Sequence, residues 1–137
     1  MLPEKGGYMA EKTINPGFSE GRGDAAARFV IAAKGIRRNI DSDIPVQQIM
    51  ILTYIWQHAK ASQAEMVKAL DMQPAAVSRH CRSLSQYYNR KGDKPVLAGQ
   101  ELIVGEKDIM DSRSTIYTLT DRAESYVLQF FTDLMGS

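Results

Sequence analysis

The chain has 137 residues, a length that suits one ordinary domain and is short for two. Hydrophobic residues make up 44% of it and charged residues 24%, a globular composition that excludes a wholly disordered chain. The formal net charge of +1 excludes a polycation, so nucleic-acid binding would have to depend on a local concentration of positive charge.

One cysteine and two histidines limit the disulfide and metal chemistry that the protein can have. The single cysteine, Cys81, excludes an intramolecular disulfide and favours a reducing compartment. No segment has the apolar core of a signal peptide or the length of a transmembrane helix, so we expect a cytoplasmic protein with no membrane partner. His58, His80 and Cys81 lack metal-ligand spacing, and nucleotide-binding and nucleophile motifs are absent from the sequence. We therefore expect neither a metal, a cofactor nor enzymatic activity.

The N-terminal segment divides into two parts. Residues 1–23 are rich in glycine and proline and lack apolar periodicity, so we interpret them as a flexible arm; an arm that crosses onto a partner subunit is the alternative. Asp24 is suited to cap a helix that runs to about Ile40, and residues 24–42 are interpreted as a dimerisation helix. Apolar residues recur there at helical spacing: Ala26, Phe29, Val30, Ala33 and either Ile36 or Ile40.

Two further helices are expected before residue 71. The first begins at Pro45, which suits a first helical turn, and runs to about Ala59. The second follows Ser62, because Glu65 stands three residues later and completes a capping box. The inward residues are expected to be Ile49, Leu52, Ile55, Trp56 and Ala59 in the first helix and Ala64, Val67 and Leu70 in the second.

A turn over residues 71–73 leads into a fourth helix, predicted over residues 74–88. Its inward face is predicted to hold Val77, Cys81, Leu84 and Tyr88, and its outward face Ala75, Ser78, Arg79, Arg82 and Gln86. Small residues let a helix approach the walls of a DNA groove, and arginines reach base edges or phosphates. Between Pro74 and Lys94 five basic residues face one acidic residue, a local charge of +4 in a chain of net +1.

The last third of the chain is expected to form a linker, a hairpin and a helix. Residues 89–100 are interpreted as the linker. Strands over residues 101–107 and 115–119 are predicted to pair across a polar tip at residues 108–114. In that tip Arg113 is suited to enter a minor groove, with Asp111 holding its guanidinium or capping the turn, and Lys107 in the stem is suited to a phosphate contact.

The predicted order is therefore α-α-α-α-β-β-α, a mainly α chain with a small β-hairpin, which is typical of a winged helix-turn-helix. Residues 43–120 would form the DNA-binding domain. Residues 121–137 would form a C-terminal helix with a strongly apolar face, which favours burial against the first helix or against a second subunit. A plain helical core without a nucleic-acid role remains an alternative.

Four segments carry a resemblance to a known family: Pro45-Val46-Gln47-Gln48-Ile49, Ser62 to Leu70, Ala76-Val77-Ser78-Arg79, and Asp111-Ser112-Arg113 followed by Tyr117-Thr118-Leu119-Thr120. Over about residues 44–123 the sequence resembles the MarR family of winged helix-turn-helix transcription regulators. The Asp-x-Arg tip with the strand end that follows is the most specific part. Only a short segment follows Thr120, whereas the family has two long C-terminal helices.

The resemblance implies a homodimer that binds a pseudo-palindromic double-stranded DNA operator, with one recognition helix per major groove and one wing arginine at each minor groove. It also implies a possible small aromatic effector, and the first and last helices would supply the dimer interface. By position, Ser62 and Gln63 would meet phosphate at a helix N-terminus. The full set of expected DNA-binding residues is Ser62, Gln63, Gln73, Ala75, Ser78, Arg79, Arg82, Lys107 and Arg113, with Asp111 supporting the wing.

A second hypothesis stays open from the sequence. The net charge near zero, the short C-terminal region and the segment at residues 1–23 also suit a winged-helix interaction module. Such a module would bind a protein of the transcription or replication machinery without reading DNA sequence.

Overall fold

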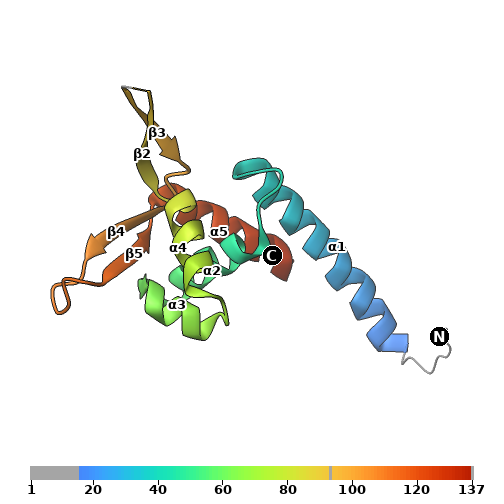
Figure 1. The fold of residues 1–137 in the computed structure, drawn as a ribbon. Coiled ribbons are helices and arrows are strands. Elements are labelled where there is room, and N and C mark those ends of the chain that lie inside the picture. The colour runs from blue at the N-terminus through green and yellow to red at the C-terminus, as the bar shows by residue number, and fades with distance from the viewer. Residues whose placement is uncertain (1–15, 93, 137) are drawn as a thin grey trace.

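The computed structural model describes residues 16–92 and 94–136 (Figure 1). Within these residues the chain is mainly helical with a small β-component, as the sequence predicted. The elements are α1 (Pro16–Asn39), α2 (Val46–His58), β1 (Ala61–Ser62), α3 (Gln63–Ala69), α4 (Pro74–Leu84), β2 (Gln86–Lys91), β3 (Lys94–Gly99), β4 (Ile103–Lys107), β5 (Thr115–Leu119) and α5 (Asp121–Met135). The sheets are β1-β5-β4 and β2-β3, both antiparallel.

The core lies between α2, α3, α4, the base of the β4–β5 wing and the start of α5. Burial of an aliphatic side chain contributes about 1.5–3 kcal/mol, so this cluster is the main source of stability. Its largest fully buried members are Ile51, Leu52, Ile55, Met66, Val77, Cys81, Leu84, Leu102, Ile103 and Val127.

The predicted phase of α2 and α3 was partly wrong. In α2, Ile51 is fully buried rather than Ile49, and Ala59 lies exposed beyond the helix end. In α3, Met66 fills the core and Ala64 is exposed. Helix α2 packs against several elements, so its neighbours decide which face turns inward. In α3 the longer Met66 side chain reaches the core where alanine does not.

Trp56 was predicted to face inward, but it lies at the edge of the core. Its ring stacks on that of Phe131, with centroids 5.2 Å apart and planes 7° apart. Because 36% of Trp56 remains exposed, the pair covers the core rather than filling it. The stack ties α2 to α5.

The wing is fastened to the helix-turn-helix through β1. Ser62 Oγ accepts the Glu65 amide proton, and Glu65 Oε1 accepts that of Ser62, so the predicted capping box is confirmed. The preceding residue, Ala61, pairs with Tyr117 of β5. A Cβ at Gly105 would lie 2.8 Å from the Thr115 and Tyr117 side chains, so close cross-strand packing requires glycine there.

The linker predicted at residues 89–100 is instead a second hairpin, β2–β3. The recognition helix α4 ends at Leu84, and Ser85 turns the chain into an extended conformation while its amide bonds back to the Cys81 and Arg82 carbonyls. Tyr88 is therefore 70% exposed on a strand, and its predicted inward position on α4 was wrong. At the hairpin base Gly99 has φ +94°, and a Cβ there would collide with the Ser85 carbonyl oxygen.

The first helix also begins earlier than predicted. It starts at Pro16, so residues 16–23 are helical rather than part of a flexible arm, and Asp24 lies inside the helix instead of capping it. The rest of the predicted arm, residues 1–15, lies outside the described residues. Proline fits a first helical turn, and the glycines that follow are tolerated in this long helix.

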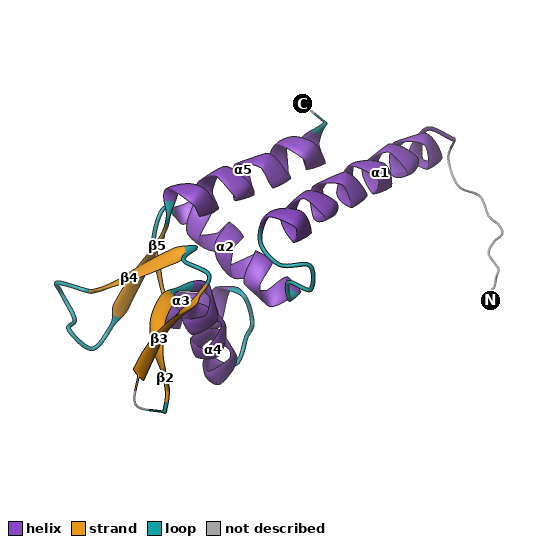
Figure 2. Ribbon diagram, turned by 90° about the horizontal axis from the view of Figure 1, so that it is seen from above, coloured by secondary structure: helices purple, strands orange, loops and turns teal. Residues whose placement is uncertain are grey.

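The long helix α1 runs beside α5 and projects beyond the rest of the described chain (Figures 1 and 2). Arg28 Nε donates to the Leu134 carbonyl at 3.1 Å, which joins the two helices. Among residues 21–39, the part of α1 whose side chains the structure describes, only Ala32 and Ile36 are buried, and the predicted inward residues Ala26, Phe29 and Val30 are exposed. Among the described residues, no helix is long and apolar enough to span a membrane.

Candidate nucleic-acid interface

The recognition helix α4 presents a small and basic outward face. Val77, Cys81 and Leu84 are fully buried, so three of the four predicted inward positions are confirmed. On the opposite side the sequence-predicted residues are all exposed: Gln73, Ala75, Ser78, Arg79 and Arg82. Gln73 precedes the helix and makes no capping bond with its side chain.

The two arginines of this face differ in their surroundings. The Arg79 side chain forms no hydrogen bond or ion pair with any described residue, so the five N–H donors of its guanidinium are available to a partner. The guanidinium carbon of Arg82 lies 4.0 Å from the ring centroid of Tyr87, the second residue of β2. This cation–π contact holds Arg82 beside the helix end and leaves the edge of its guanidinium open to donate.

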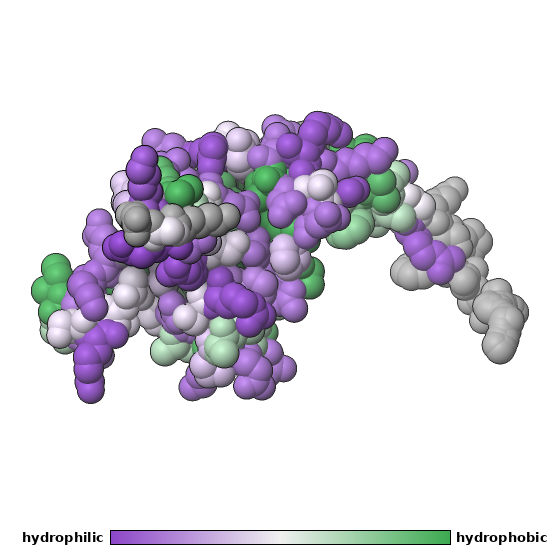
Figure 3. Space-filling model, turned by 45° about the horizontal axis from the view of Figure 1, so that its top comes forward, coloured by the Kyte–Doolittle hydropathy of each residue, from purple (hydrophilic) through white to green (hydrophobic). Residues whose placement is uncertain are grey.

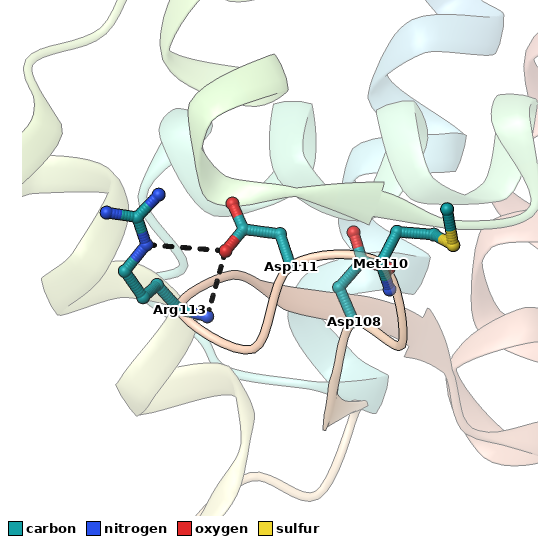
Figure 4. A network of polar contacts seen from close by, with 4 residues as sticks. All are labelled: Asp108, Met110, Asp111 and Arg113. Carbon is teal, nitrogen blue, oxygen red and sulfur yellow. Dashed lines mark hydrogen bonds and ion pairs between the residues drawn. The ribbon is translucent and has the colours of Figure 1, made fainter.

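The wing tip is an ordered turn built on two aspartates (Figure 4). Asp108 Oδ1 accepts the Met110 amide proton at 3.0 Å, and Asp111 Oδ1 accepts the Arg113 amide proton at 3.1 Å. The same oxygen lies 3.4 Å from Arg113 Nε. Since the Arg113 side chain is 91% exposed, the pair adds little stability, but it leaves the terminal guanidinium nitrogens directed away from the turn.

Two apolar residues at this tip were missed by the sequence reasoning. Ile109 and Met110 are 97% and 90% exposed, the highest values among the large hydrophobic side chains of the described chain. They account for an apolar surface at the far end of the wing, which Figure 3 shows at its left edge. The sequence feature that could have indicated them is a pair of apolar residues in an otherwise polar turn. Apolar side chains at such a tip are suited to insert into a DNA groove.

The structure gives Ser62 and Gln63 internal partners. Ser62 is only 8% exposed, and its hydroxyl is used in the capping box. Gln63 Nε2 donates to the Tyr117 hydroxyl at 2.8 Å, and burial raises the pKa of that buried phenol. These residues therefore fix the wing to the start of α3. Lys107, at the end of β4, is exposed and its side chain is free of described partners.

A partly buried row of polar side chains joins α4 to the start of α2 and to Gln100. Gln48 is 4% exposed, its Nε2 lies 3.2 Å from Nδ1 of His80, and its Oε1 accepts from Gln100 Nε2 at 3.5 Å. An amide that donates to Nδ1 fits the neutral imidazole. Burial, and then the positive charge of Arg79, lower the pKa of His80 below its ordinary value.

This arrangement predicts a pH-dependent stability. The folded state disfavours protonated His80, so the free energy of unfolding should be complete above the ordinary pKa of 6.5 and should fall as the pH decreases from there toward the lowered folded-state pKa. Denaturant unfolding measured roughly one unit above and roughly one unit below that value tests it. His80→Gln should lose this part of the pH dependence; an equal drop in the variant would contradict the assignment.

Cys81 has the chemistry of a core residue. It is fully buried on the inward face of α4, and burial raises the pKa of its thiol to about 12. The thiolate, which is the reactive form, is therefore scarce at neutral pH. Cys81 therefore has the properties of a small buried hydrophobic residue rather than those of a redox sensor.

One apolar hollow adjoins the Trp56–Phe131 stack. It has a volume of about 300 Å³ and lies between α2, α5 and the end of α3. Thr53 and Gln57 contribute polar groups to a lining that is otherwise apolar and aromatic, the composition typical of small-molecule sites. Within the described residues, no group of three or more His, Cys, Asp or Glu side chains is placed to hold a metal ion.

The spatial arrangement separates two halves of the molecule. Helices α3 and α4 lie on one side, and α1 with α5 on the opposite side, while the β4–β5 wing extends laterally (Figure 2). The outward face of α4 and the wing tip are therefore free of the long helices.

Comparison with known proteins identifies this arrangement. No protein-family profile matches the sequence, and no curated protein is similar to it. Among solved structures, it is similar to RV1404 from Mycobacterium tuberculosis (TM-score 0.67, 21% identity, covering 95% of this chain and 80% of that one). It is also similar to an S. aureus MepR variant bound to an oligodeoxyribonucleotide (TM-score 0.63, 22% identity, 90% and 79%).

A third similar structure is described as the MarR family transcription regulator SP03579, with TM-score 0.57 and 22% identity over 88% of this chain and 69% of that one. These likenesses establish the fold. The chain has the winged-helix fold of the MarR-family regulators, as its sequence resemblance implied.

Proposed function

We propose that the protein is a dimeric transcription regulator that binds double-stranded DNA in a sequence-specific way. The observation that carries the proposal is the exposed face of α4, with Ser78 and the unpaired Arg79, beside a wing that ends in the exposed Arg113. Helix α4 would enter a major groove, and the wing tip would reach the adjacent minor groove. The MepR variant of the same fold, bound to an oligodeoxyribonucleotide, supports this mode of use.

The DNA-contacting residues we propose are those on the exposed face and the wing. Arg79 would donate to base edges, and Arg113 would enter the minor groove with Asp111 steadying its Nε. Lys107 would meet phosphate from the wing stem. The remaining proposed contacts are Gln73, Ala75, Ser78 and Arg82 on α4 and, at the start of α3, Ser62 and Gln63 through their backbone or their free atoms.

The exposed apolar surface of α1 supports the dimer. Phe29, Val30 and Ile31 are each about half exposed, and three consecutive helical residues point about 100° apart, so no single neighbour within the subunit covers them. Leu128 and Met135 add exposed apolar surface on α5. Surface of this kind on a projecting helix pair suits a twofold interface, and a twofold dimer matches a pseudo-palindromic operator.

We therefore divide the chain into a DNA-binding domain at residues 43–120 and two dimerisation segments, α1 and α5. A cytoplasmic location follows from the proposed target and suits the unpaired Cys81. The 300 Å³ hollow between α2 and α5 is the proposed site of a small aromatic effector, since Tyr54 and Phe131 line it. A thermal-shift screen with aromatic acids checks this, and the absence of any shift would count against a sensor role.

The test of the proposed function is duplex binding at several salt concentrations. We expect binding at low ionic strength that weakens linearly on a double logarithmic plot, because Lys and Arg displace counterions from the phosphates. Absence of duplex binding at low salt would reject the proposal. A stoichiometric protein partner whose binding survives both Arg79→Ala and Arg113→Ala would instead indicate the interaction module.

A further inference from the structure

The β2–β3 hairpin has no role in the core. Its strands pair only with each other, separately from the wing sheet, and its main neighbour is the end of α4. No side chain of β3 is buried, and Tyr88, Val96 and Leu97 are about half exposed or more. A two-stranded hairpin without a buried face is marginally stable alone. Its exposed strands are therefore free to contact a partner, which would stabilise them.

The base of the hairpin is nevertheless fixed. The Gln100 amide donates to the Ser83 carbonyl at 3.1 Å, and the Leu102 amide donates to the Leu84 carbonyl at 2.8 Å. The left-handed Gly99 brings β3 against Ser85 at a distance that a side chain would forbid. The strands therefore leave the last turn of α4 in a defined direction.

The tip of the hairpin carries positive charge. Residues 86–99 contain three basic residues and one acidic residue, a net charge of +2. Arg90 and Lys94 stand on either side of the turn, both exposed, and neither side chain forms an ion pair or hydrogen bond with a described residue. An unpaired basic tip on an extended ribbon is suited to an anionic partner.

The hairpin also lies on the side of the molecule that carries the proposed DNA interface. Figure 2 shows β2–β3 with α4 on the side opposite α1 and α5, and Figure 1 shows the hairpin projecting from the end of α4, away from α3. Through Tyr87 it is joined to the recognition helix, because the Arg82 guanidinium lies over the Tyr87 ring at 4.0 Å. The Arg82–Tyr87 contact therefore lies where the exposed face of α4 meets the hairpin, at the edge of the surface proposed to face the groove.

We propose that the β2–β3 hairpin is a second DNA-binding arm. Arg90 and Lys94 contact sugar–phosphate backbone beside the major groove that receives α4, while Tyr87 positions Arg82 toward the same groove. The proposal rests on the proposed function, and the ligand is the phosphate backbone of duplex DNA. Backbone contacts fix position without reading sequence, so the arm adds affinity rather than specificity.

The test is the double variant Arg90→Ala/Lys94→Ala in the full chain, compared with the wild type on a selected operator and on a random duplex. We expect weaker binding to both duplexes, by a similar factor on the order of tenfold, and a salt dependence shallower by about 0.9 for each phosphate that the variant leaves unneutralised. Lys34→Ala/Arg38→Ala is the matched control: it removes the same charge from exposed positions of α1, and it should leave the binding nearly unchanged once light scattering shows the same oligomeric state.

The role of Tyr87 is tested by a double-mutant cycle. Tyr87→Leu should weaken operator binding about as much as Arg82→Ala, should add little in the Arg82→Ala background, and should be rescued by Tyr87→Phe, which keeps the ring. Additive losses would overturn the positioning role.

The outcomes separate this proposal from the proposed function. Unchanged affinity and salt dependence in Arg90→Ala/Lys94→Ala, in a protein whose operator binding Arg79→Ala still weakens, would overturn the arm alone. Loss of operator preference without loss of random-duplex affinity would also overturn it, since the arm would then read bases. Failure of the wild-type protein to bind any duplex would reject the proposed function itself.

Discussion

Replacement of Phe29 by glutamate is expected to separate the dimer into monomers and to weaken operator binding by roughly 100-fold or more. Phe29 is 55% exposed on α1, next to Arg28, which contacts the end of α5, and the proposed second subunit would cover it. A carboxylate there would have to be desolvated without a partner. The loss in DNA binding follows because two linked half-site contacts become two independent ones. Light scattering and operator titration measure the two effects.

The matched control is Val46→Glu. Val46 is 63% exposed, as an apolar residue at the start of α2 and outside the proposed interface, so the same charge is introduced without a dimer penalty. We expect a normal dimer and nearly normal operator binding for this variant. If Phe29→Glu remained dimeric, or became monomeric while keeping full operator affinity, the proposed role of α1 would be wrong.

Arg79→Ala is expected to cost about 1–3 kcal/mol at each half-site, roughly 5- to 150-fold, on a selected operator and to relax the sequence preference. The reason is that an arginine reads a base edge through two parallel hydrogen bonds, and Arg79 is exposed on α4 without a described partner. On a random duplex the loss of affinity should be smaller, because the variant removes only the electrostatic attraction between one guanidinium and the DNA phosphates. Fluorescence anisotropy with both duplexes measures the difference.

Arg79→Lys sharpens this prediction, because lysine keeps the charge and lacks the planar fork. It should keep most of the random-duplex affinity and still lose operator preference. If Arg79→Ala lost the same affinity on both duplexes and Arg79→Lys recovered all of it, Arg79 would be a phosphate contact that reads no sequence.

Local chemistry explains which features the sequence could predict. The capping box depends on two residues three positions apart, Ser62 and Glu65, and the Val77/Cys81/Leu84 stripe depends on helical periodicity, so both were predicted correctly. The polar turn around Asp111 and Arg113 was likewise recognisable from residue types that favour tight turns. These features need no knowledge of distant packing.

Features that depend on tertiary neighbours were harder to predict. The sequence predicts a linker where the β2–β3 hairpin lies, because none of the described side chains of its strands is buried and the segment lacks the alternation that marks a strand. The sequence does contain one indication of a hairpin: Gly92, which suits a turn, lies between Tyr87-Tyr88 and Val96-Leu97, which suit strands. The Gln48–His80 contact joins residues 32 positions apart, and nothing local indicates it.

The central claim is that two copies of this winged helix read one twofold-symmetric DNA site. Selection of bound sites from a pool of random duplex DNA tests it most directly, with the full-length protein and Arg79→Ala in parallel. The account predicts a palindromic consensus whose half-sites are centred about 10 base pairs, one helical turn, apart, and its loss or degeneration for the variant. Enrichment of no sequence, or of an asymmetric consensus that Arg79→Ala retains, would contradict it.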